Sequence, residues 1–467
     1  MGFYDNTLAV KVGMLFFLLL GAAIFSIRYG AGKGSVKETC RWIIFMGCVM
    51  RIGYLLYTPC TMRGHDLWEL TPDACGKAGY VLQIAVNGQL PPGYELQYYQ
   101  QPLFFILGGL WAKGVNVLLT LRGQSDFLVL ADVSRWVACV ASCLILPVAS
   151  RLFDLFEIRD YGKCFGMMLV SFSPVFYLMG GWIGEDSLLV LFMALALLVT
   201  GYYEKQPSYK NIILLALIYG FGMMTKISMA VPALYTAYVF GKMLWKEMHK
   251  GKLLKQFALF AVISLPLGLW FNVRNLILYG QPLFYVLKQD VEGSLYTGGS
   301  SYIARFLLPD IGNLLRTPYA NPLDDYNLVS YLLKSELFGE FTYQVPAWIP
   351  VILLFLHVMI NLCIIWYLIK IWRKRERWEY SRKLLIWYAG ILVFSAFSYL
   401  TNPFGCTMDY RYYAVLSVVK GLLWGQFLEQ REEKKSWFSR IGVSFPAFWK
   451  TVTVLFSGFS MLMYLMV

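Results

Sequence analysis

The sequence has little charge and very little histidine. Only 15% of its 467 residues are charged, and it holds 28 acidic residues and three histidines. No set of His, Cys and Glu residues occurs at a metal-ligand spacing, so a transition-metal site built by the protein is not predicted. Internal repeats are also absent, as is any stretch with the composition of a separate soluble domain. The absence of internal repeats argues against a transporter built from such repeats.

Long apolar runs account for most of the chain. The sequence is 58% hydrophobic and has a mean hydropathy of +0.55. Runs of 17 or more nearly uncharged residues are long enough to cross about 30 Å of hydrocarbon. The first run lacks a small-residue cleavage site, so we expect a retained helix rather than a signal peptide. The pattern predicts an all-α polytopic membrane protein whose spans, about 12 in number, lie near residues 8–27, 39–58, 133–150, 164–182, 187–203, 211–225, 227–241, 256–273, 347–369, 384–401, 411–428 and 447–466.

The net charge of +13 does not indicate nucleic-acid binding. Lys and Arg fall in short clusters between the apolar runs, as expected of cytoplasmic loops. If the apolar run 102–121 crossed the membrane, the most basic loop would lie outside. We therefore predict that this run lies on the membrane surface or re-enters it shallowly. The segments then expected in the cytoplasm are 28–41, 151–163, 242–255, 370–383 and 429–440.

Two long segments, 59–132 and 274–346, are expected on the outer side of a single domain spanning residues 1–467. Loops of this length in a compact protein are more often functional than merely connecting. Within the first, helical spacing of apolar residues begins at Tyr80 and ends at Asn87-Gly88, a suitable left-handed cap. This pattern predicts an amphipathic, juxtamembrane helix lying on the surface.

Nine cysteines are present, and most lie in apolar runs, where Cys is usually a small buried hydrophobe. Three others, Cys60, Cys75 and Cys406, fall in segments expected outside. A Cys60–Cys75 disulfide is a hypothesis, because the outer side permits oxidation.

Ionisable residues gather where the chain leaves the bilayer on the expected outer side. Carboxylates and cations at one interface suit the handling of an anionic lipid head group. Lys and Arg neutralise phosphate, and a carboxylate takes the proton of an attacking hydroxyl. The residues concerned are Asp66, the Glu185-Asp186 turn, Lys226, Arg274 and Arg411.

Each of these residues also has a purely structural explanation. Asp186 fits a helix N-cap, and Lys226 suits a side chain that reaches from a helix end to water. Arg274 and Arg411 suit interface anchors, and Asp66 suits a solvated charge.

Two further ionisable residues are placed by their positions. We expect a structural or supporting role for His65 rather than metal ligation, and Arg51, inside a span, should face a partner in the helix bundle. A divalent ion held by Asp66 with Glu185 or Asp186 stays open.

Segments in order along the chain, "NGQLP" among them, resemble the GT-C superfamily of membrane glycosyltransferases, and the resemblance is spread over about residues 42 to 415. The resemblance is strongest to the branch of protein O-mannosyltransferases and lipid A aminoarabinose transferases, which is like glycosyltransferase family 39. Their order is more specific than any one of them. The other segments are "RIGYLLYTPCTMRGHDLWE", "QYYQQPLFF", "FSPVFYLMGGWIGEDSLLV", "GFGMMTKISMAVPAL", "PLGLWFNVRNLILYGQPLFY" and "SYLTNPFGCTMDYRYYAVL".

The resemblance implies a GT-C-like fold and a lipid-linked-sugar transferase of the cell envelope. Such enzymes move a sugar from a polyprenyl phosphate to a hydroxyl of a glycan, lipid or protein acceptor, on the outer face of the membrane. Direct displacement by one base implies inversion. A multi-pass protein of a plasma membrane, bacterial in character, is expected, and no cofactor follows beyond the open question of a divalent cation.

The resemblance also implies roles for individual residues. Asp66 matches the first-loop Asp of the family, which acts as the catalytic base or positions the acceptor, and Glu185 and Asp186 match the second acidic turn. Lys226 and Arg274 match residues that handle the donor phosphate. Gln101 stands where many relatives carry His or Lys, and Glu185 stands where Asn is usual. The remaining substrate-binding candidates are Arg411, Tyr99 and His65.

Two other functions remain as alternatives. A transporter or flippase of lipid-linked sugars would bind near the midplane, whereas the ionisable residues here cluster at one interface. A non-catalytic assembly partner would keep its function when Asp66 is replaced by Asn.

Overall fold

The computed structural model describes residues 7–30, 35–121, 126–246, 250–309, 311–315, 326–373, 379–431 and 445–467. Parts of four predicted cytoplasmic segments, including residues 432–440, lie outside these ranges. Within them every regular element is a helix, and one isolated bridge joins Tyr296 and Phe404. The protein is therefore all-α, as predicted.

Ten helices of the described ranges are long and apolar enough to cross a membrane, or eleven if one bent pair counts as a span. This confirms a polytopic membrane protein, although the set differs from the predicted one. The expected spans 211–225 and 411–428 correspond to helices of only 17 residues, α10 (Tyr209–Thr225) and α18 (Val415–Arg431). Conversely, α4 (Leu103–Thr120), expected on the surface, has the length and hydropathy of a span.

The chain forms two compact units, each built from separated stretches of sequence. The first contains Leu55–Val148 and Met179–Lys288. The prediction of one domain over 1–467 stays a prediction. The helices of the first unit are α3 (Lys77–Leu82), the π-helix η1 (Gln83–Asn87), α4, α5 (Phe127–Ser134), α6 (Trp136–Leu155), α8 (Val175–Gly181), α9 (Asp186–Lys205), α10, η2 (Ile227–Met229), α11 (Ala230–Lys246) and α12 (Lys250–Tyr279). The C-terminal end of α6 and the N-terminal end of α8 belong to the second unit.

Helix α3 is present where the sequence predicts a helix and continues into η1, which ends at Gly88 in the left-handed region (φ 69°), as expected. All six α3 residues are buried, however. The helix packs against α4 and α5, so neither of its faces is open as an amphipathic surface helix requires.

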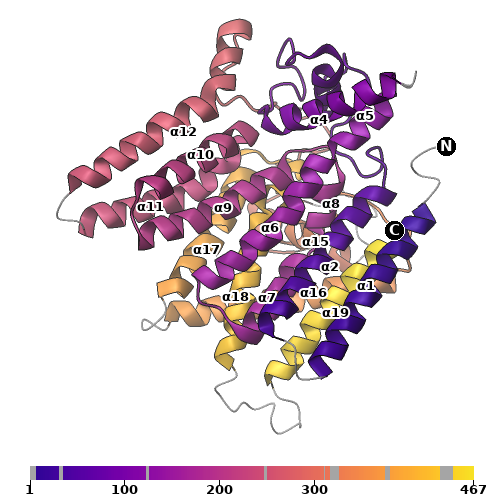
Figure 1. Ribbon diagram of the computed structural model, residues 1–467, viewed down its shortest axis with the longest axis vertical. Helices are drawn as coiled ribbons and strands as arrows, with labels where there is room; N and C mark the ends of the chain where they lie inside the picture. The colour runs from indigo at the N-terminus through magenta and orange to yellow at the C-terminus, as the bar shows by residue number, and fades with distance from the viewer. Residues whose placement is uncertain are drawn as a thin grey trace. The chain divides into compact units, whose positions relative to one another are not determined.

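In the same unit α10 packs along α12, where the hydrogens of Gly220 and Gly268 leave room for Leu267 and Met223 (Figure 1).

The second unit contains Asn6–Tyr54, Ala149–Leu178 and Gln289–Val467. A pair of glycines on each of two helices brings α7 and α18 together (Figure 1). A Cβ on Gly162 or Gly166 would lie 2.5 Å from the carbonyl oxygen of Gly425 or Gly421, respectively. The helices of the second unit are α1 (Thr7–Gly30), α2 (Val36–Tyr57), α7 (Asp160–Ser171), α13 (Tyr302–Phe306), α14 (Ile311–Leu315), α15 (Leu328–Phe338), α16 (Trp348–Arg373), α17 (Glu379–Thr401), η4 (Gly405–Met408), η5 (Tyr410–Tyr413), α18 and α19 (Phe445–Met466).

Arg51 lies inside α2 and is fully buried. A charged side chain buried in an apolar run needs polar partners, and Arg51 was predicted to have them. Its guanidinium donates to the carbonyl oxygens of Gly47 at 2.9 Å, Ser171 at 2.7 Å and Val170 at 3.1 Å. It therefore binds α2 to the C-terminal turn of α7.

The nine cysteines are free thiols. The hypothesis of a Cys60–Cys75 disulfide is therefore wrong for this structure. Instead, the N–H of Cys60 donates to Asp132 Oδ1 at 2.7 Å, and its thiol is buried.

Candidate functional site

The turn between α8 and α9 carries two buried carboxylates. Glu185 and Asp186 are both inaccessible to solvent. The Lys226 ammonium donates to Glu185 Oε1 at 2.6 Å and to Asp186 Oδ1 at 2.7 Å. The Lys77 ammonium pairs with Glu185 Oε2 at 3.3 Å. These four residues, which we call the acidic cluster, form a compact and formally neutral ion-pair network.

Lys226 reaches the cluster because α10 ends there. Its backbone is extended (φ −164°), and the chain turns at once into η2. The side chain of Lys226 is 21% exposed, whereas those of Lys77 and Glu185 are at most 3% exposed. Of these three side chains, that of Lys226 is therefore the one that reaches the protein surface.

Burial alone would raise the pKa of the Glu185 carboxyl, but the ammonium groups of Lys226 and Lys77 outweigh it and hold the pKa below its usual range. Glu185 is thus a carboxylate at neutral pH. The second oxygen of Asp186, Oδ2, is buried and accepts no hydrogen bond from the described residues. A buried acceptor without a donor is costly, so this oxygen is an unusual feature of the cluster.

Asp66 is joined to this cluster through Lys77. The main-chain N–H of Lys77 donates to the carbonyl oxygen of Asp66 at 2.8 Å. Asp66 has a left-handed backbone (φ 54°), as do Arg63 and Trp68, so the loop turns sharply here. The Asp66 side chain is exposed, and no donor among the described residues binds its carboxylate.

Tyr99 lies among these charges. Burial raises the pKa of its phenol to about 12, with a lowering contribution from Lys226 and raising contributions from Glu185 and Asp66. The charges of all three groups act on the Tyr99 phenol, which stays protonated at neutral pH. The Tyr99 ring meets the edge of Tyr285 at a centroid distance of 5.5 Å.

Arg274 holds the first loop against α12. Its guanidinium donates to the Pro91 carbonyl oxygen at 3.3 Å and to Asn275 Oδ1 at 2.7 Å, and it lies over the Tyr279 ring. These contacts fit an anchoring role in this structure. Its role toward a donor phosphate stays a prediction.

His65 and Gln101 lie at the margin of the cluster. The His65 ring contacts Trp182 edge-on at 4.7 Å, which fits a supporting role. Gln101 is buried, and its Oε1 accepts no hydrogen bond. Its neighbour Gln100 is the residue that faces Glu185. When the side-chain amide of Gln100 is oriented with its nitrogen toward the carboxylate, this nitrogen donates to Glu185 Oε1 at 2.9 Å. Sequence reasoning selected Gln101 alone.

Arg411 belongs to the second compact unit and has partners of its own there. Its Nε lies 3.1 Å from Asp409 Oδ2, and its Nη2 donates to the Tyr412 hydroxyl at 3.0 Å. The residues that the structure brings together within the first unit are Asp66, Tyr99, Glu185, Asp186 and Lys226.

Sequence reasoning missed Lys77, and it missed a second buried cation, Arg135. The Arg135 guanidinium donates to the carbonyl oxygens of Thr58 and Gly181, each at 2.7 Å, and to Asp132 Oδ2 at 2.7 Å. Thr58 precedes the loop that carries Asp66, and Gly181 precedes the Glu185 turn. An Asp-Arg pair three residues apart inside an apolar run is a signal that could have found it.

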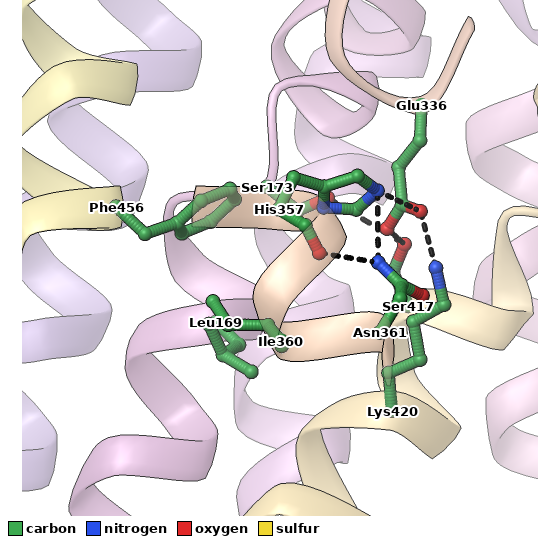
Figure 2. A pocket seen from close by; sticks show the side chains of 9 residues that line it. All are labelled: Leu169, Ser173, Glu336, His357, Ile360, Asn361, Ser417, Lys420 and Phe456. Carbon is green, nitrogen blue, oxygen red and sulfur yellow. Dashed lines mark hydrogen bonds and ion pairs between the residues drawn. The ribbon is translucent and has the colours of Figure 1, made fainter. Parts of the chain in front are cut away.

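A further buried network lies in the second unit, on α15, α16 and α18 (Figure 2). Glu336 Oε2 pairs with the Lys420 ammonium and with His357 Nε2 at 3.1 Å, and Oε1 accepts from the Ser417 hydroxyl at 2.8 Å. Although burial opposes it, the charges of Lys420 and His357 lower the pKa of Glu336 to about 2. The cavity beside it has a volume of about 20 Å³, room for a single water.

The acidic cluster offers a divalent ion few ligands. Both Glu185 oxygens and one Asp186 oxygen already pair with ammonium groups. Mg²⁺ and Ca²⁺ require several oxygen ligands. The cluster as arranged fits hydrogen bonding to a substrate better than cation binding.

The sequence profile of the dolichyl-phosphate-mannose-protein mannosyltransferase family matches residues 120–270. The matched stretch contains Glu185, Asp186 and Lys226 but not Asp66. No curated protein matches the chain. The profile match, together with the apolar helices, supports a multi-pass membrane glycosyltransferase of the GT-C superfamily.

Proposed function

We propose that this protein transfers a sugar from a polyprenyl-phosphate donor to a hydroxyl of a glycan, lipid or protein acceptor at the outer face of a plasma membrane. The observation that carries the proposal is the exposed Asp66 carboxylate, held through Lys77 beside the buried acidic cluster. A positioned carboxylate can take the proton of an attacking hydroxyl, and neighbouring buried ion pairs can hold the loop that carries it.

In the proposed reaction, Asp66 takes the proton of the acceptor hydroxyl. The acceptor oxygen forms a bond to the anomeric carbon as the bond from that carbon to the phosphate oxygen breaks. Polyprenyl phosphate leaves with the bonding electrons, and the anomeric configuration inverts. One base suffices for this step, and no covalent sugar–enzyme intermediate forms.

The remaining residues orient the substrates. The Tyr99 phenol, protonated at neutral pH, donates a hydrogen bond to a sugar hydroxyl. The ammonium of Lys226, whose side chain reaches the protein surface, stabilises the charge that develops on the leaving phosphate. Arg274 supports this region by holding the first loop to α12.

The test uses purified full-length protein and its Asp66→Asn variant. Each is incubated with a panel of polyprenyl-phosphate sugars and a membrane extract as acceptor, and released polyprenyl phosphate is measured. We expect the variant to lose roughly 10²- to 10⁴-fold in rate while donor binding persists. Glu69→Gln, at an exposed position of the same loop, is the matched control and should keep its activity.

Equal release by wild type and Asp66→Asn would remove Asp66 from the reaction. Donor binding without release, with every donor and with an acceptor shown to be competent, would favour a transporter or flippase of lipid-linked sugars.

A further inference from the structure

Two thiols from distant parts of the sequence touch in the second unit. Cys40 lies in the second turn of α2, and Cys164 lies in the second turn of α7. Their sulfur atoms are 3.6 Å apart, and the Cys164 sulfur lies 3.9 Å from the carbonyl oxygen of Val36. This is a contact between unbonded thiols, since the S–S distance of a disulfide is about 2.05 Å.

The contact is in register with the other link between the same helices. Arg51 lies 11 residues beyond Cys40 and reaches Ser171, which lies 7 residues beyond Cys164. At about 1.5 Å per residue, these steps are roughly 16 Å along α2 and roughly 10 Å along α7, and the length of the Arg side chain makes up the difference. The helices run in the same direction, so Cys40 and Cys164 meet because of how α2 and α7 pack.

The thiols lie close to the protein surface although they are themselves mostly buried. Cys40 is 3% exposed and Cys164 is 5% exposed. The residue before Cys164, Lys163, forms an ion pair at 2.6 Å with Asp154, whose side chain is 59% exposed. The ion pair directly beside Cys164 therefore lies at the protein surface.

We propose that Cys40 and Cys164 form an oxidation-sensitive dithiol that closes to a disulfide between α2 and α7 when the protein meets a peroxide. One thiolate attacks a peroxide oxygen, which gives a sulfenic acid and releases water after proton transfer. The second thiolate attacks that sulfur, the S–S bond forms, and a second water leaves. The two thiols are oxidised by two electrons and hydrogen peroxide is reduced, so no other reactant is needed.

The sequence places this end of both helices beside segments expected in the cytoplasm, where thiols are kept reduced. The open dithiol is then the resting form, and the disulfide forms under oxidative conditions and is reversed by cellular thiols. The disulfide would join the N-terminal turns of α2 and α7. The hydrogen bonds of Arg51 to Val170 and Ser171 already join the same two helices further along.

The experiment treats full-length protein in detergent with hydrogen peroxide, blocks remaining thiols, and analyses the digest by mass spectrometry without reduction. We expect a peptide pair joined through Cys40 and Cys164, which disappears after dithiothreitol. Cys40→Ser and Cys164→Ser should each abolish it, and Cys139→Ser, in α6, should not. The oxidised wild type should also melt at a higher temperature than the reduced form, a shift that neither Cys40→Ser nor Cys164→Ser should show.

Full alkylation of both thiols after peroxide treatment would overturn the proposal. So would oxidation of each to a sulfinic acid without a cross-link, or a cross-link from Cys40 to another cysteine. None of these results depends on whether the protein is a glycosyltransferase.

Discussion

The main-chain N–H of Lys77 donates a hydrogen bond to the carbonyl oxygen of Asp66 at 2.8 Å, and the side chain of the same lysine pairs with Glu185. One buried residue thus connects the exposed acid of the first loop with the buried acids of the α8–α9 turn. Its backbone places the loop, and its charge balances the carboxylate.

Replacing Lys77 by Met should destabilise the protein. The variant keeps the length and most of the volume of the side chain, but it leaves the fully buried Glu185 with one ammonium instead of two. Breaking a buried ion pair by removing one partner costs about 3 kcal/mol. We expect the apparent free energy of unfolding in a detergent titration to fall by that order, and Lys77→Arg to recover most of it. Lys113→Met, on the exposed side of α4, is the control. Equal stability of the two Met variants would show that Lys77 is dispensable.

Glu185 should make stability depend on pH in a defined window. Its folded-state pKa lies below the unfolded value of 4.5, so the unfolded chain binds more protons as the pH falls. The stabilisation is present in full above about pH 4.5 and is lost as the pH drops toward the folded-state pKa. Melting temperatures of wild type and Glu185→Gln should differ by a constant amount at neutral pH and converge in acid. Convergence at alkaline pH instead would contradict the assignment.

The pair of Glu336 and Lys420 should show strong coupling. Glu336→Gln leaves a buried ammonium without its carboxylate, and Lys420→Met leaves a buried carboxylate with His357 alone, so each should cost about 3–5 kcal/mol. The double variant removes both charges and should lose less than the sum of the two single variants. Asp154→Asn, which breaks the exposed pair with Lys163, should cost less than about 1 kcal/mol. Simple additivity for Glu336 and Lys420 would rule the coupling out.

A methyl group at Gly166 should push α7 and α18 apart. The new Cβ would lie 2.5 Å from the Gly421 carbonyl oxygen, a backbone atom that cannot rotate away. Overpacking of this kind costs about 1–3 kcal/mol. Gly458→Ala, in α19, has open space around its Cβ and should be neutral or stabilising, because Ala favours helix. If both variants melt alike, the glycine contact does not limit the packing.

The sequence predicted the elements of this structure that depend on local pattern. Apolar runs located most of the membrane helices, and the Asn87-Gly88 pair located the end of η1. Charged residues at helix ends located Glu185, Asp186 and Lys226, which do meet in one cluster. In each case the signal lies within a few residues of the feature.

What depends on contacts between distant residues was not predictable in the same way. Lys77 begins α3 directly after a polar stretch of sequence that gives no sign of burial, and its partner Glu185 is more than a hundred residues away. The spacing in α3 showed one apolar face but could not show that α4 and α5 cover the rest. Two cysteines in one outer loop suggested a Cys60–Cys75 disulfide, yet Cys60 contacts Asp132 instead.

Arg135 has a consequence for how the protein is made. Its guanidinium binds carbonyl oxygens of Leu55 and Thr58, which are synthesised long before it, and of Gly181, which is synthesised after it. Until Gly181 has left the ribosome, this buried charge lacks one of its acceptors in a medium that supplies no water to replace it. The set of contacts that Arg135 makes is therefore complete only after Gly181 has been synthesised. The loop that carries Asp66 and the turn that carries Glu185 gain their common anchor only when the second of them has been inserted.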